Sequence, residues 1–217
     1  MAGKGFASIP YIPDLHNLAF DAAVCFIAAV LLAVLINAEA QAWMATLLGD
    51  ARPNAKDRLH FNVFFHLSLP GTFCFFLAGF GWPKPIDLDP SKFAYPRLFT
   101  VIARFAGPIA NIFLANIAAS IIFVFKFLDM DPLVFMMVAG VNLTTAVYNL
   151  IPIPPMAAGS LMTVWIPQKS PWVKRLLYYS GSALLIAIFL IERAAGMKLV
   201  SPYLNPLIWK ILGFLTG

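Results

Sequence analysis

The chain is short of charge and of cysteine, and it lacks the short motifs that mark several enzyme classes. Only 12% of its 217 residues are charged, and Cys25 and Cys74 are its two cysteines. Both lie in apolar runs, so we expect buried thiols rather than a disulfide. No H-x-x-x-H, C-x-x-C, G-x-S-x-G or glycine-rich phosphate loop occurs. These absences argue against a standard zinc site, a serine hydrolase and a nucleotide-binding loop.

Apolar residues are what the sequence has in abundance. They make up 61% of the chain, which is well above the share typical of water-soluble domains. The chain therefore belongs in a lipid bilayer, and its net charge of +5 indicates anchoring by Lys and Arg at the cytoplasmic surface. Basic residues do not gather with aromatic ones in a water-facing cluster, so nucleic acid is not an expected partner.

The apolar runs predict an all-α integral membrane protein with about five to six transmembrane helices. A small β-hairpin on the cytoplasmic side is predicted between the regions 58–64 and 82–89. We expect an extracytoplasmic segment over 1–16, a membrane core over 17–165 and C-terminal transmembrane helices over 166–217. The expected spans are 17–48, 98–127, 132–151, 176–191 and 204–215, with 71–82 either crossing or re-entering the bilayer.

Basic residues set the expected orientation. Before the first span only Lys4 is basic, whereas a group of Lys and Arg residues lies between the first two long spans. Positive charge is retained on the cytoplasmic side, so we expect the N-terminus outside and the chain in the bacterial inner membrane. The basic group consists of Arg52, Lys56, Arg58, Lys84, Lys92 and Arg97.

Three polar residues interrupt the first apolar run. Asn37 and Gln41 are four positions apart and share one helix face, which is the spacing of the two zinc ligands in a helical H-E-x-x-H motif. Amides are poor zinc ligands, and Ala38 stands where that motif has its general base. Such amides also hydrogen-bond across membrane helices. Glu39 points about 200° away from Asn37, either as a functional carboxylate or toward water or a loop cation.

Two proline-containing segments indicate a polar groove inside the bilayer. "AGPIAN" (106–111) places Pro within a span, and "NLIPIPPMAAG" (149–159) breaks another span with three prolines. Broken backbone at membrane depth is tolerated only where it is buried in protein or lines a cavity. His60 and His66 lie six positions apart in an irregular segment, which is not a standard ligand spacing.

These segments occur in a characteristic order along roughly residues 30–165. The order resembles that of the site-2 protease family of intramembrane zinc metalloproteases, in its compact bacterial form without PDZ or CBS domains. The matching segments are "NAEAQAW" (37–43) with "GD" (49–50), "DRLHFNVFFHLSLPGT" (57–72), "GWPKPIDL" (81–88), "AGPIAN" (106–111) and "NLIPIPPMAAG" (149–159).

The departures from the family pattern fall at its active centre. The two zinc-binding His positions hold Asn37 and Gln41, the general-base position holds Ala38, and the third ligand position holds Ala157. The resemblance therefore implies a site-2-protease-like fold with no catalytic residue, no metal ligand and no cofactor. On this interpretation the chain is not an enzyme but a pseudoprotease.

The leading functional hypothesis is a scaffold or accessory subunit that binds transmembrane segments of other proteins in a hetero-oligomeric complex surrounded by membrane lipids. The candidate groove residues are Asn37, Gln41, His66, Asn111 and Asn149. One alternative is an active zinc protease with a rearranged site made of His60, His66 and Glu39. Another is a lipid-binding or small-molecule-binding protein, although no internal repeat indicates a transporter.

Overall fold

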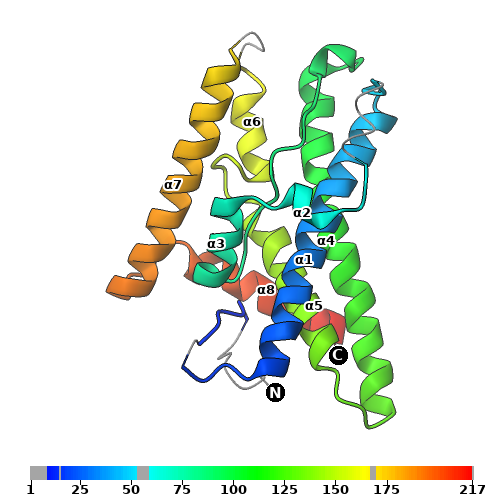
Figure 1. Cartoon of the computed structure of the whole chain (residues 1–217), viewed down its shortest axis with the longest axis vertical. Coiled ribbons are helices and arrows are strands. Elements are labelled where there is room, and N and C mark those ends of the chain that lie inside the picture. The colour runs from blue at the N-terminus through cyan, green and yellow to red at the C-terminus, as the bar shows by residue number, and fades with distance from the viewer. Residues whose placement is uncertain (1–8, 15, 53–58, 167–169, 217) are drawn as a thin grey trace.

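Three helices form the core of the protein in the computed structural model, which describes residues 9–14, 16–52, 59–166 and 170–216. They are α1 (Phe20–Leu47), α4 (Pro96–Phe127) and α5 (Leu133–Tyr148). All three pack against one another, with α4 running antiparallel to α1 and α5 returning beside both (Figure 1). Helices α1, α4 and α5 thus form a closely packed three-helix centre.

Small residues allow these helices to approach closely. The buried face of α1 is rich in alanine, and α4 buries Ala103, Ala106 and Gly107 against it. A Cβ added at Gly107 would lie 2.9 Å from the backbone oxygen of Asn37, so the two backbones are nearly in contact. Membrane helices gain most of their association energy from such packing, because apolar burial drives little association within lipid.

The remaining helices surround this centre. They are α2 (Val63–His66), α3 (Leu69–Ala78), α6 (Ser160–Thr163), α7 (Pro171–Ala195) and α8 (Ser201–Thr216), with short 3-10 turns at Pro90–Lys92 and Ala157–Gly159. Helix α7 packs on α3, and α8 packs on α4 and α5. Helix α7 forms one edge of the molecule (Figure 1), where the Ser68 hydroxyl lies 2.6 Å from the Tyr178 hydroxyl.

Within the described residues, three helices are long and apolar enough to cross a membrane: Phe20–Leu47, Pro96–Phe127 and Trp172–Ala195. Their outward faces expose large apolar side chains, as lipid contact requires. The prediction of five to six spans is not supported. Helices α3 and α5 have 10 and 16 residues, which is short of the roughly 20 that a bilayer needs.

The predicted β-hairpin is wrong for the part of the chain that the structure describes, which holds no strand. Residues 63–66 form α2 instead, and the segment after Trp82 makes one isolated bridge, between Leu67 and Pro83. The reason is chemical: Pro83 and Pro85 have no backbone N–H to donate to a ladder. Lys84 still donates its N–H to the His66 carbonyl at 2.7 Å.

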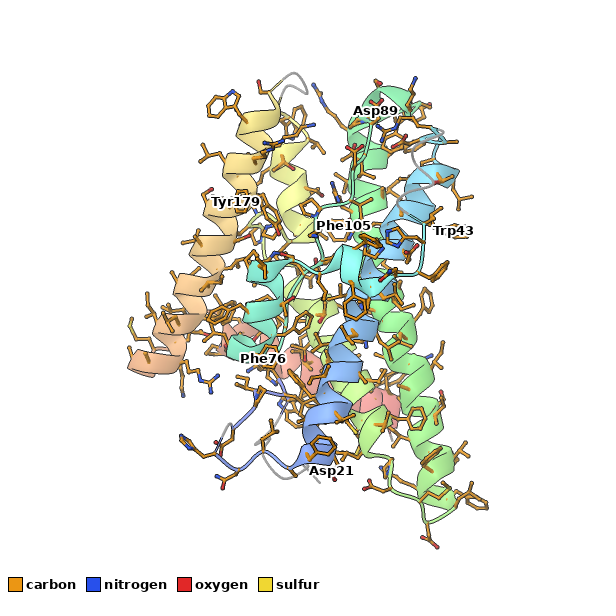
Figure 2. All side chains as sticks on the ribbon, viewed as in Figure 1. Asp21, Trp43, Phe76, Asp89, Phe105 and Tyr179 are labelled. Carbon is orange, nitrogen blue, oxygen red and sulfur yellow. The ribbon has the colours of Figure 1, made fainter. Side chains whose placement is uncertain are left out.

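The two ends of the molecule carry different segments. The end of α1 and the start of α4 lie at the same end as the start of α7, and the turn between α4 and α5 lies at the opposite end with the start of α1 (Figure 1). Figure 2 marks the two ends with Asp89 and Asp21. Lys56 and Arg58 of the predicted basic group, with Lys4 and most of segment 1–16, lie outside the described residues.

Candidate functional site

A cavity of about 370 Å³ opens beside the core. Its floor is α1, and its walls come from the start of α4, from α6, from α7 and from the segments 82–90 and 154–159. Side chains from distant parts of the sequence therefore meet in one space. The lining includes Asn37, Gln41, Thr100, Arg104, Asn149, Met156, Ala157, Ser160, Thr163, Lys174, Leu177 and Tyr178.

The proline-rich break after α5 is fixed by Asn149, the residue that ends this helix. Its side-chain amide donates to the Thr145 carbonyl at 2.8 Å, and its side-chain oxygen accepts the N–H of Ala157 at 3.0 Å. Its backbone oxygen accepts the N–H of Ala158 at 3.0 Å. One asparagine thus satisfies backbone groups on both sides of the break, which lets irregular chain lie inside the protein.

A chain of polar side chains leads from the cavity into the core. Arg104 donates to Gln41 Oε1 at 2.9 Å, Gln41 donates to Asn37 Oδ1 at 2.7 Å, and Asn37 donates to Asn111 Oδ1 at 2.6 Å. Asn111 donates in turn to Asn142 Oδ1 at 2.7 Å. Each amide is paired with a neighbour, as buried polar groups in a bilayer require. We call these five residues the amide relay.

The residues at the cavity floor do not suit a zinc ion. The side-chain oxygens of Asn37 and Gln41 are both engaged as hydrogen-bond acceptors, and Ala157 has no donor atom in its side chain. The guanidinium of Arg104 also contacts Gln41, and its fixed positive charge would repel a divalent cation. Zinc needs three or four firm N, S or O ligands, so no metal chemistry is assigned to this cavity.

The predicted site residues separate into two groups. Four of them line the cavity: Asn37, Gln41, Asn149 and Ala157. The other predicted positions do not, and they are described next.

Ala38 is fully buried and packs near Ile86 instead of facing the cavity. Asn111 is also fully buried and lies behind Asn37 in the amide relay. His66 is not a groove residue either: it contacts Glu39, which points away from Asn37. His66 and Asn111 therefore do not line this cavity.

At the end of the molecule that carries Asp89, an ion pair joins two loops. Arg52 donates to both carboxylate oxygens of Asp50, at 2.6 and 3.0 Å, and lies 3.2 Å from Asp87. Asp50 also accepts the N–H of Asp89 at 2.9 Å. Hydrogen bonding to Asp50 raises the pKa of the Arg52 guanidinium above its ordinary value. The contacts to Asp87 and Asp89 join the start of the loop after α1 to the 82–90 segment, which lines the cavity.

Sequence reasoning missed two members of the amide relay, Arg104 and Asn142. Each is a polar residue within an apolar run, which was the available signal, because such residues are costly unless they are paired. Their partners are 63 and 31 positions away. Helix periodicity alone does not reveal which helices place them side by side.

The chain is similar to a curated protein named "Putative zinc metalloprotease YwhC", from Bacillus subtilis (strain 168). The two are 28% identical over 176 residues, which cover 76% of this chain and 79% of the relative. No family model matches the chain, and no solved structure matches it. The relationship is metalloprotease-like and points toward a protease. It contradicts the prediction that the chain is not an enzyme, and that prediction is corrected here.

Proposed function

We propose that the chain is an intramembrane protein of the site-2-protease type, and that its cavity receives an extended polypeptide segment of another membrane protein. Two things support the type: the metalloprotease-named relative over most of the chain, and the ordered motifs from "NAEAQAW" to "NLIPIPPMAAG". The main support for a polypeptide as the occupant is that the cavity has a polar lining and lies among helices long enough to span a bilayer.

An extended polypeptide in a membrane needs hydrogen-bonding partners that lipid does not supply. The cavity walls offer the hydroxyls of Thr100, Ser160 and Thr163 beside apolar surface from Leu177 and Met156. The Ser160 hydroxyl donates to the Ala157 carbonyl at 2.6 Å, and its lone pairs can still accept a hydrogen bond. Such a mixture of polar and apolar lining suits a backbone with intervening side chains.

The expected partners are other membrane proteins in a hetero-oligomeric complex, with lipid around the exposed apolar faces. The predicted core 17–165 and C-terminal part 166–217 act together in this proposal, because α7 contributes Lys174, Leu177 and Tyr178 to the cavity wall. The location is the bacterial inner membrane with the N-terminus outside. Arg52 is linked through Asp50 to Asp89, and Asp89 lies at the same end of the molecule as the start of α7 (Figure 2). Basic charge near this end supports its cytoplasmic placement.

Site-specific photo-cross-linking in native membranes tests the proposal. A photoreactive amino acid replaces Thr163 in the cavity, and the matched control replaces Phe113, which is 65% exposed on α4. We expect position 163 to form adducts with polypeptides, and peptide mapping to place the attached residues in transmembrane or adjoining segments. The control should form adducts mainly with lipid.

Adducts at position 163 with lipid or a small metabolite alone would overturn the proposal and favour a lipid-binding or small-molecule-binding cavity. Equal polypeptide adducts at positions 163 and 113 would also count against it, because they would reflect random collision in the bilayer.

A further inference from the structure

On the side of α1 that faces away from the cavity, one carboxylate meets two imidazoles. Glu39 comes from α1, His60 from the segment before α2, and His66 from the last position of α2. One ligand atom from each residue lies within 4.8 Å of those from the other two. None of the three residues lines the cavity. We call them the Glu39 cluster.

The cluster is already arranged around Glu39 Oε1. His66 Nε2 lies 3.0 Å from this oxygen and His60 Nδ1 lies 4.0 Å from it. The two imidazole rings stack with centroids 4.6 Å apart. Glu39 and His66 are buried, whereas the His60 side chain is 26% exposed, so the cluster reaches the surface of the molecule at His60.

Backbone contacts fix the carboxylate in place. Glu39 Oε1 accepts the N–H of Phe61 at 2.9 Å and that of His60 at 3.3 Å. Outer hydrogen bonds of this kind orient ligands around metal ions. They also tie the segment before α2 to α1, so that both imidazoles are brought to the same side of Glu39.

The second carboxylate oxygen supplies an independent indication of a missing partner. Glu39 Oε2 is buried and has no hydrogen-bond partner among the residues that the structure describes, and the residue as a whole is only 5% exposed. A buried carboxylate oxygen left unpaired in a membrane protein is costly. A hydrogen bond between Glu39 and His66 alone leaves this atom unexplained, whereas a cation beside the two imidazoles would pair it.

We propose that Glu39, His60 and His66 bind one zinc ion at a site separate from the cavity. Two imidazole nitrogens and one carboxylate oxygen are ordinary zinc ligands, and three protein ligands leave a position open. The inference does not rest on the polypeptide-binding proposal, because the two sites use different residues on opposite faces of α1.

The test measures zinc on full-length protein in mild detergent, with any affinity tag removed and bound metal stripped by a chelator. We expect about one zinc per chain by elemental mass spectrometry after reloading, a rise in the thermal unfolding midpoint with zinc, and a tetrahedral-type visible spectrum with cobalt(II). Glu39→Gln, His60→Gln and His66→Gln should each weaken zinc binding by at least about tenfold.

The matched control is His16→Gln. It removes the remaining histidine of the chain, which is exposed, and should leave zinc binding unchanged. His60→Gln alters the most exposed member of the cluster and keeps the test usable should the buried variants fail to fold. Folded wild-type protein that takes up no zinc would overturn the proposal. Zinc uptake that His60→Gln leaves unchanged in folded protein would overturn it equally.

Discussion

Asn111 joins three helices through one side chain. From α4 it donates to the Ala33 carbonyl of α1 at 3.0 Å and to Asn142 of α5 at 2.7 Å, and it accepts from Asn37. Because it is completely buried, water cannot replace these contacts. Asn111, at the centre of the amide relay, therefore links the three core helices and also supports Asn37 at the cavity floor.

Asn111→Ala should lower the free energy of unfolding by about 1–3 kcal/mol, since it leaves buried groups on Asn37 and Asn142 unpaired. Thermal unfolding in detergent measures the effect. Asn116→Ala, on the exposed face of the same helix, is the matched control and should be nearly neutral. Equal midpoints for the two variants would show that the amide relay does not stabilise the core.

At the scale of the elements, α7 rests against the proline-rich break. A Cβ added at Gly181 would collide with the carbonyl oxygen of Pro154, so the absence of a side chain sets how closely α7 approaches this wall. Lys174, Leu177 and Tyr178 of α7 line the cavity on the same helix. The width of the cavity thus depends on one glycine contact between two segments far apart in the sequence.

Gly181→Ala should force α7 away from the break and cost about 1–3 kcal/mol of stability, as overpacking does. The matched control is Gly213→Ala on α8, where an added Cβ meets nothing within 4 Å and helix propensity improves slightly. In thermal unfolding, the midpoint of Gly181→Ala should be lower than that of wild type, and the midpoint of Gly213→Ala should be slightly higher. A stable Gly181→Ala variant would mean that α7 is not packed as described.

Sequence patterns predicted some of these elements and not others, for physical reasons. The long apolar runs predicted α1, α4 and α7 because span length is a local property. Asn37 and Gln41 were placed on one face by helix geometry, and both line the cavity. The sequence offered the Glu39 cluster only as an alternative metal site. His60 and His66 lie 21 and 27 positions from Glu39, and they meet it only because the chain reverses direction after α1.

At the scale of the whole molecule, the distribution of charge gives a testable orientation. The loop holding Lys92 is at the end opposite to the turn holding Asp131, which connects α4 and α5. With the N-terminus outside, Asp131→Cys should react with a membrane-impermeant maleimide on intact cells, and Lys92→Cys should react only after permeabilisation. Cys25 and Cys74 are buried, so their own reaction with the maleimide should be slight. The reverse labelling pattern would invert the proposed topology.

The central claim is that a polypeptide occupies the cavity between α4 and α7. Its most direct test staples Thr100→Cys to Leu177→Cys, which line the cavity from these two helices, with a reducible bifunctional maleimide. The measurement is the yield of polypeptide adducts from a photoreactive residue at position 163. We predict loss of adducts in the stapled protein, recovery after reduction, and normal yield in each single-cysteine variant. An undiminished yield in the stapled protein would contradict the account.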